Sequence, residues 1–271
     1  MSDDMPNALE RILAEVRHEL ERRKRERPLD PDSLPRLRGA AGGGRFAEAL
    51  ARTGIGIVAE FKRRSPSAGV LREKADLPEV VGAYARGGAV ALSVLTDGPN
   101  FGGSLDDLRL AREACELPRL RKDFIVDPYQ LHESLAAGAD AVLLIVAALE
   151  QSQLTALHAE AWALGLDVLV EVHDRAELGR ATDAGASIVG VNNRDLRDFS
   201  VDVERTERLM GDMPADVTVV SESGIGSAGQ LERLQRLGVH AVLVGESLMR
   251  SADPQAALMG LRTFRDTEAA L

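Results

Sequence analysis

Residues 137–146 read AGADAVLLIV, a small-residue turn followed at once by an apolar run. Glycine tolerates the left-handed backbone that ends a helix, and an unbroken apolar run of this length is typical of a strand buried on both faces. The same join of glycine turn and apolar run recurs at 86–96, 183–192 and 237–245. This repetition predicts helices that alternate with parallel strands.

Eight such strands can be placed after Gly54, and no residues are left over for a second sheet. Eight strand–helix units in one chain predict an α/β fold, a single (β/α)8 TIM barrel. A doubly wound open sheet is the alternative that the alternation also allows. The predicted strands are 55–60, 91–96, 117–122, 141–146, 168–172, 188–192, 217–222 and 241–245.

The residues before the barrel predict an N-terminal helical extension. Residues 7–27 place apolar side chains at helical spacing, and prolines and a triple glycine follow. A short helix at 46–51 could then cover the closed bottom of the barrel. We therefore expect an extension at 1–44, packed on the barrel, and the barrel itself at 45–271. The apolar face of the first helix is Leu9, Ile12, Leu13, Val16 and Leu20.

Composition and charge exclude several classes of partner. The 271 residues are 45% apolar, and their formal net charge is −10, which argues against nucleic acid and acidic membranes. The first ten residues are polar, so we expect a cytoplasmic protein without a membrane span. Cys115 is the only cysteine and no Cys/His cluster has zinc-ligand spacing, so we expect no disulfide and no metal. The basic run 22–27 is interpreted as a solvated helix face and Trp162 as a packing residue.

Polar residues gather where the predicted strands end, which is where barrel enzymes place their chemistry. Lys62 and Lys122 each end a strand although the chain has only four lysines among 33 basic residues. An ammonium group can donate a proton or change its pKa on burial. The alternative is that these lysines are structural partners of Glu60 and Asp123. Carboxylate or amide side chains also lie at strand ends, with Glu60 on the same strand as Lys62 and Glu171, Asn192 and Glu222 on later strands.

Two later segments, 221–226 and 244–249, carry a strand through glycine into a helix. Glycines let backbone N–H groups approach an anion, and the loops after strands seven and eight bind phosphate in many TIM barrels. A phosphorylated substrate is therefore expected. Residues 224–229 also satisfy G-x-G-x-x-G, but a dinucleotide site is disfavoured because only one further strand follows.

Six ordered segments closely resemble indole-3-glycerol-phosphate synthase, an enzyme of tryptophan biosynthesis, and the resemblance covers nearly the whole chain. The segments are 57–67 IVAEFKRRSPS, 92–97 LSVLTD, 121–127 RKDFIVD, 169–173 LVEVH, 190–196 GVNNRDL and 221–225 SESGI.

The resemblance implies a substrate and a division of roles. The substrate would be 1-(2-carboxyphenylamino)-1-deoxyribulose 5-phosphate, which closes its ring with loss of carbon dioxide and water. Lys122 would be the general acid and Glu171 the base of the dehydration. Lys62 would steer the substrate carboxylate and contribute to proton transfer. Glu60, Asn192 and Glu222 would hold the sugar hydroxyls and the charge constellation. The implied substrate-binding residues are Ser65, Pro66, Phe101, Phe124, Arg194, Ser223, Gly224, Gly245 and Glu246.

No cofactor is expected, because an iminium-like intermediate can lose carbon dioxide without a separate electron sink, and positioned acids and bases suffice. Other tryptophan-pathway enzymes are conceivable partners. Two alternative functions remain open from sequence: another phosphosugar enzyme such as phosphoribosylanthranilate isomerase, and a non-catalytic paralogue.

Overall fold

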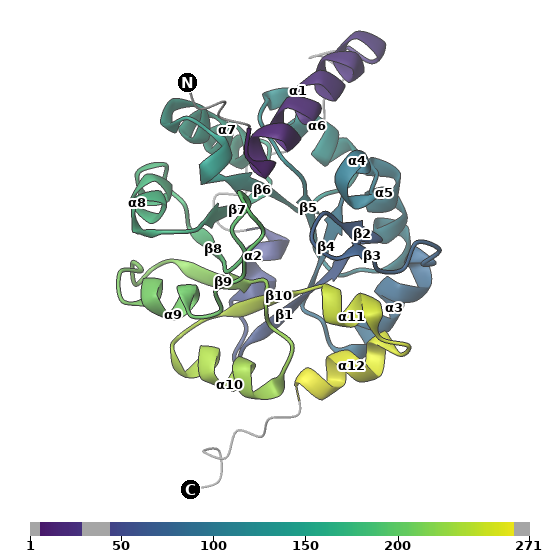
Figure 1. The fold of residues 1–271 in the computed structure, drawn as a ribbon, viewed down its shortest axis with the longest axis vertical. Coiled ribbons are helices and arrows are strands. Elements are labelled where there is room, and N and C mark those ends of the chain that lie inside the picture. Colours follow the sequence, from purple (N-terminus) through teal and green to yellow (C-terminus); the bar gives the residue numbers. More distant parts are fainter. Residues whose placement is uncertain (1–5, 29–43, 263–271) are drawn as a thin grey trace, which may run out of the picture.

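The computed structural model describes residues 6–28 and 44–262, and its eight parallel strands form a closed barrel surrounded by helices (Figure 1). The strand order β1-β10-β9-β8-β7-β6-β5-β4 confirms the TIM barrel and excludes the open sheet. The predicted strand limits differ from the observed ones by no more than two residues. The strands are β1 Gly56–Phe61, β4 Ala91–Leu95, β5 Arg119–Lys122, β6 Ala141–Ile145, β7 Asp167–Val172, β8 Ile188–Asn192, β9 Thr218–Glu222 and β10 Ala241–Val244.

Glycine turns end several of the outer helices, as the sequence predicted. Gly138 and Gly238 have φ values of 85° and 86°, the left-handed backbone that closes a helix before the next strand. The helices outside the barrel are α3 Leu77–Gly87, α5 Leu105–Ala114, α6 Pro128–Ala136, α7 Gln151–Ala163, α8 Arg175–Asp183, α9 Arg205–Met210, α10 Ala228–Arg236 and α12 Pro254–Leu261.

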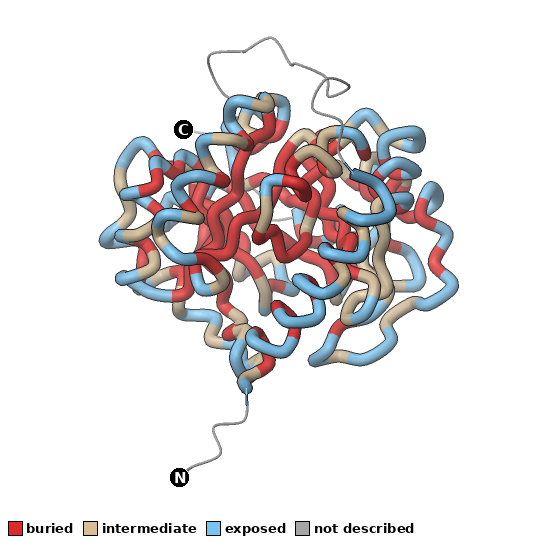
Figure 2. Tube along the Cα trace, turned by 90° about the horizontal axis from the view of Figure 1, so that it is seen from above, coloured by how far each residue is buried: buried red, intermediate tan, exposed pale blue. Residues whose placement is uncertain are grey.

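The core lies inside the barrel wall and between the wall and the helices, as the continuous red of the strands shows (Figure 2). Strands β1, β6, β7 and β8 are buried along their whole length because helices cover their outer faces. Trp162 was expected to pack between helix and barrel. That prediction was wrong: Trp162 lies on the outward side of α7 and is 46% exposed.

Helix α2, Arg45–Leu50, covers the bottom of the barrel as predicted and is held there by Asp167, the first residue of β7. The buried Asp167 carboxylate accepts hydrogen bonds from the backbone N–H groups of Gly44, Phe46 and Ala47 at 2.8, 3.0 and 2.9 Å. These are N–H groups of a helix start that lack partners within the helix.

We expect Asp167→Ala to lower the free energy of unfolding by about 2 kcal/mol, the upper end of the range for losing a helix cap. Urea denaturation followed by circular dichroism measures this loss. Asp167→Asn keeps an acceptor oxygen and should lose less. Equal stability of Asp167→Ala and the parent chain would contradict the capping role.

Helix α1, Ala8–Glu26, lies on the opposite side, against the loops at the mouth of the barrel. Its predicted apolar face is buried in the common core. The basic run is not simply a solvated face, because Arg23 and Lys24 form ion pairs with Glu133 and Asp127 of the α6 region at 2.5 and 2.6 Å. Those ion pairs fix the end of α1 to the barrel.

The predicted division into an extension at 1–44 and a barrel at 45–271 stays a prediction, since residues 1–5 and 29–43 lie outside the described residues. Among the described helices, none combines the length and the apolar character that crossing a bilayer requires.

Candidate active site

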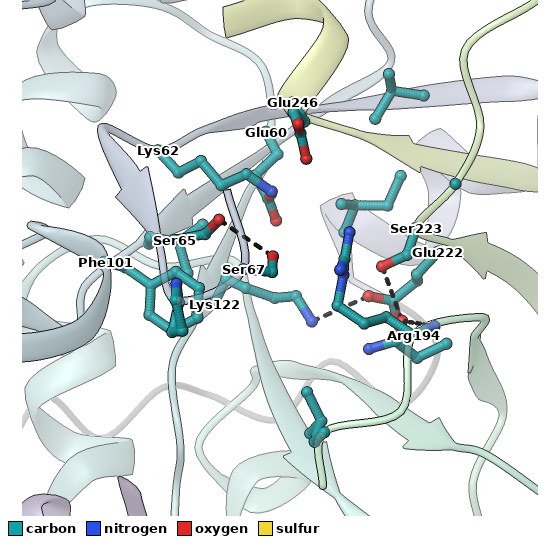
Figure 3. A pocket seen from close by; sticks show the side chains of 18 of the residues that line it. Glu60, Lys62, Ser65, Ser67, Phe101, Lys122, Arg194, Glu222, Ser223 and Glu246 are labelled. Atoms are coloured by element: carbon teal, nitrogen blue, oxygen red, sulfur yellow. Dashed lines mark hydrogen bonds and ion pairs between the residues drawn. The ribbon is translucent and has the colours of Figure 1, made fainter. Parts of the chain in front are cut away.

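A cavity of about 420 Å³ opens at the carboxyl ends of the barrel strands (Figure 3), within the size range of small-molecule sites. The structure places every site residue predicted from the sequence in the lining of this one cavity. They are Glu60, Lys62, Ser65, Pro66, Phe101, Lys122, Phe124, Glu171, Asn192, Arg194, Glu222, Ser223, Gly224, Gly245 and Glu246.

Strand register sets the height of the charged side chains. In the ladder, Lys122 is opposite Leu95 and Glu171 is opposite Ile145, and both apolar partners also line the cavity. Asn192 and Glu222 are direct neighbours across β8 and β9. Neighbouring strands therefore bring charged, polar and apolar side chains together at the mouth of the barrel, where TIM-barrel enzymes place their chemistry.

Lys122 stands between two carboxylates. Its Nζ lies 2.7 Å from Glu171 Oε2 and 2.9 Å from Glu222 Oε2. Both carboxylate side chains are nearly inaccessible to solvent, and the lysine side chain is 13% exposed. Asp123 does not pair with Lys122, because the next side chain along the strand points out of the barrel. Asp123 instead pairs with the fully buried Arg121 at 2.8 Å. This pairing removes the structural alternative for Lys122.

Burial and charge act in opposite directions on this group of residues. Burial alone would lower the pKa of Lys122, but the carboxylates of Glu171, Glu222 and Glu60 raise it above its usual value. Burial also raises the pKa of Glu222 to about 7, with a contribution from the neighbouring Glu171 charge and against the attraction of Lys122. For Glu171 burial is outweighed by Lys122 and His173, which lower its pKa.

Lys62 forms the second ion pair of the cavity, with its Nζ 2.6 Å from Glu60 Oε1. Lys62 is thus paired with Glu60, as the alternative of a structural ion pair predicted, although both side chains line the cavity. Ser93 on β4 donates a hydrogen bond to Glu60 Oε2 at 3.4 Å, which ties this carboxylate to the barrel wall.

Two glycines leave room for the carboxylates. A Cβ atom on Gly190 of β8 would lie 2.2 Å from Glu222 Oε1, and one on Gly245 would lie 2.5 Å from Glu60 Oε1. Neither contact is sterically possible, so each carboxylate occupies space that only glycine leaves free.

We expect Gly190→Ala to fold, because a strand accepts alanine, but to displace Glu222 and lower kcat by about 10²-fold. Steady-state kinetics with circular dichroism separates the two effects. Gly179→Ala is the control, since an added Cβ there meets nothing within 4 Å. An unchanged kcat in Gly190→Ala would show that the position of Glu222 is unimportant.

The rim beside β8 and β9 has an unusual backbone. Ser223 is a non-glycine residue with φ 67° and is followed by Gly224 with φ 75°. Left-handed serine is strained and persists where the surrounding structure holds it, often at functional sites. Here the Ser223 hydroxyl donates to Asn192 Oδ1 at 2.8 Å.

On the other side of this rim, α11, Glu246–Arg250, follows Gly245. The Glu246 side chain pairs with Arg250 at 3.1 Å. That pairing partly neutralises the acidic group at the start of α11, and Arg250 itself lines the cavity.

One wall of the cavity is apolar. The rings of Phe101, in the short helix α4 (Gly98–Phe101), and of Phe124 lie 6.4 Å apart with a tilt of 38°. Sequence reasoning missed Leu143 and Leu243, which form part of the lining. The two-residue alternation along β6 and β10 could have found them. It also missed Ser247, which lies within the segment 244–249, and Arg250, for which strand ends gave no signal.

The connection after β1 has regular structure of its own. Strands β2 (Arg64–Ser65) and β3 (Gly69–Val70) form a small antiparallel hairpin beside the cavity. Arg63 anchors its base through a two-point ion pair with Asp107, both contacts being 2.8 Å, and its guanidinium lies 5.0 Å from the centre of the Phe61 ring.

Within the described residues, 6–28 and 44–262, no group of three or more His, Cys, Asp or Glu side chains is placed to hold a metal ion. The G-x-G-x-x-G segment at 224–229 lies between β9 and α10 of the closed barrel, so it lacks the open-sheet setting of a dinucleotide fold.

Comparison with known families shows to which family of TIM-barrel proteins this chain belongs. The family model described as indole-3-glycerol phosphate synthase matches residues 9–261. The chain belongs to the indole-3-glycerol phosphate synthase family. That family consists of decarboxylating lyases of tryptophan biosynthesis, and the resemblance inferred from the six segments is confirmed.

Curated relatives of the indole-3-glycerol phosphate synthase family match almost end to end. "Indole-3-glycerol phosphate synthase 2" of Streptomyces coelicolor is 48% identical over 258 residues, which is 95% of this chain and 99% of the relative. The synthase of Rhizorhabdus wittichii is 47% identical over 263 residues, 96% of this chain and 99% of the relative.

Solved structures of other enzymes share the synthase's barrel. 3-Hexulose-6-phosphate synthase from Salmonella typhimurium gives a TM-score of 0.60 at 15% identity, over 76% of this chain and 96% of that one. Thiamine phosphate pyrophosphorylase from Pyrococcus furiosus gives 0.56 at 19% identity, over 77% and 94%. These likenesses show the fold alone.

Proposed function

We propose that this chain makes indole-3-glycerol phosphate from 1-(2-carboxyphenylamino)-1-deoxyribulose 5-phosphate, with Lys122 as general acid and Glu171 as general base. The single observation that carries the proposal is the position of one buried ammonium between two buried carboxylates, with Nζ to Oε2 distances of 2.7 and 2.9 Å, at the centre of the cavity.

The first step is ring closure. The ring carbon that bears the carboxylate forms a bond to the ketone carbon, and the ketone oxygen takes a proton from Lys122 to become a hydroxyl group. A general acid has to enter the reaction protonated, and the carboxylates around Lys122 ensure this because they raise its pKa against the effect of burial.

Decarboxylation and dehydration follow. The ring nitrogen system of the closed intermediate is iminium-like, so the electron pair of the breaking carbon–carbon bond moves into the ring as carbon dioxide leaves. Glu171 then removes the proton from the former C1 of the ribulose, and the new hydroxyl group takes a proton from Lys62 and leaves as water. Glu171 suits this role because Lys122 and His173 lower its pKa against the effect of burial, which keeps it unprotonated.

The remaining residues bind and orient the substrate. Lys62, which points into the cavity beside Glu60 (Figure 3), would attract the substrate carboxylate. Ser65, Ser223 and the backbone N–H groups near Gly224, Gly245 and Glu246 would hold the phosphate. Phe101, Phe124 and Pro66 would contact the anthranilate ring, with Arg194, Asn192 and Glu222 facing the sugar.

The test is a turnover assay with the purified chain and the synthetic substrate. Fluorescence should report indole-3-glycerol phosphate, together with one carbon dioxide per product. Turnover of phosphoribosylanthranilate instead would identify an isomerase, and binding without turnover would identify a non-catalytic paralogue. Either result would overturn the proposal.

A cytoplasmic location belongs to the same proposal, since a substrate that carries both phosphate and carboxylate does not cross a bilayer unaided. Association with other enzymes of tryptophan biosynthesis stays a prediction.

A further inference from the structure

Two carboxylates share Lys122, and by that contact alone they are nearly equivalent. Glu171 Oε2 and Glu222 Oε2 lie 2.7 and 2.9 Å from the same Nζ. Both side chains are almost wholly buried, with exposures of 1% and 2%. One ammonium cannot neutralise two buried anions, so one carboxylate tends to hold a proton. The contact with Lys122 does not determine which one holds it.

The second oxygen of each carboxylate breaks the equivalence. Glu171 Oε1 and Glu222 Oε1 are both buried without a hydrogen-bond partner among the described residues. Glu171 Oε1 lies 3.6 Å from His173 Nε2, whereas Glu222 Oε1 lies against the bare backbone of Gly190. Of these two carboxylates, only Glu171 has a second basic nitrogen within ion-pair distance among the residues that the structure describes.

His173 is held firmly in this place. Its backbone N–H donates to Glu177 Oε2 at 2.7 Å, and its Nδ1 lies 3.0 Å from the same oxygen. A proton on Nδ1 satisfies Glu177, which leaves Nε2 directed at Glu171. The imidazole is 7% exposed. His173 follows Glu171 by two residues and lies one position beyond the end of β7, where its Nε2 comes within 3.6 Å of Glu171 Oε1.

The charges around His173 favour its protonated form. Burial disfavours the imidazolium, but the hydrogen bond to Glu177 and the charges of Glu171 and Glu177 raise its pKa above the usual value. Arg205 of α9 opposes this, while Asp195 in the β8–α9 loop lies 3.9 Å from that guanidinium and also interacts favourably with His173.

We propose that His173 is a positioning residue whose cation keeps Glu171 ionised, so that Glu171 acts as the base and Glu222 takes the excess proton. The role of Glu171 as base rests on the proposed function, whereas the electrostatic pairing of His173 and Glu171 does not. Supporting this assignment, Glu222 has a pKa raised by burial to about 7, while the pKa of Glu171 is lowered.

The pairing can be tested without turnover. A histidine ring titration by NMR on the intact free enzyme should show His173 protonated above the usual histidine range, with a pKa that falls in Glu171→Gln. His158 on α7, whose pKa is lowered by burial, serves as the internal control. A His173 that is neutral at pH 6, or that titrates identically in Glu171→Gln, would overturn the inference even if the enzyme is active.

The consequence for catalysis is tested by the pH profile of His173→Gln. Loss of the His173 cation should raise the pKa of Glu171 and so move the acidic limb of the kcat profile to higher pH by about one unit. This is the low end of the pKa shift that an opposite charge this close produces. One unit below the parent limb, kcat should therefore fall about tenfold, with KM and the alkaline plateau nearly unchanged.

A merely structural role would lower kcat at every pH, and that result would refute the proposal. Glu177→Gln removes the negative charge beside Nδ1, which favours the imidazolium, and should shift the limb in the same direction. It provides a second variant if His173→Gln folds poorly. His158→Gln should leave the profile unchanged. If the parent enzyme formed no indole-3-glycerol phosphate, the proposed function would be wrong. The NMR titration would still test the pairing of His173 and Glu171.

Discussion

Lys122→Met is expected to lower kcat by about 10²–10⁴-fold, the usual contribution of a positioned general acid. Methionine fills similar space but carries no proton to donate, and it leaves Glu171 and Glu222 facing one another without the ammonium now 2.7 and 2.9 Å away. Steady-state fluorescence kinetics with the synthetic substrate gives the ratio of kcat values.

The Lys122→Met variant also has a predicted stability signature. Burial already raises the pKa of Glu222 to about 7, above its ordinary value, so the stability gained by keeping it protonated is present at low pH and is lost as the pH rises through about 7. Without Lys122 this loss should be larger. The Tm deficit of the variant should therefore be greater at pH 8.5 than at pH 5.5.

The exposed Lys74 provides the matched control for this variant, because it lies outside the cavity lining. Lys74→Met should retain the parent kcat. If Lys122→Met turned over as fast as Lys74→Met, Lys122 could not be the acid.

Glu171→Gln is expected to reduce kcat by about 10²–10⁴-fold with a small change in KM, because glutamine keeps the shape but cannot accept the proton in the dehydration half. The side chain is 1% exposed, so water cannot readily take its place. Rapid quenching should detect carbon dioxide release before product, since decarboxylation precedes the step that needs this base.

Glu73→Gln, at an exposed position in the β1–α3 connection, is the control for the loss of one carboxylate. Its rate should match that of the parent. The assignment of Glu171 fails if Glu171→Gln keeps full turnover, or if carbon dioxide and indole-3-glycerol phosphate form at equal reduced rates from a slowed ring closure.

Much of the fold could be predicted from sequence because its causes are local. A glycine in the left-handed region ends each of several helices, and an apolar run such as 141–146 can only be satisfied by burial on both faces. The side chains at strand ends could be predicted as well, since the two-residue alternation places Glu60 and Lys62 on the same side of the chain. Polar residues at the ends of eight parallel strands must meet at one mouth, which predicted the residues that line the cavity.

The sequence could not predict which side chains form ion pairs across the barrel. It could not say whether Lys122 pairs with adjacent Asp123 or with Glu171, 49 positions away, because the barrel register decides which strands are neighbours. Likewise, it left Trp162 indistinguishable from a packing residue, since helical spacing alone does not fix which face of α7 meets the barrel.

The sequence by itself determined the repeating strand–helix units and the family, because these follow from local patterns along the chain. Only the tertiary structure decided the electrostatics of the site. The Glu171 and Glu222 carboxylates both contact the Lys122 ammonium, while Glu171 also lies near His173 and Glu222 lies against Gly190. Charge–charge energies depend on distances of a few ångströms between residues from different strands, and such distances exist only once the barrel has closed.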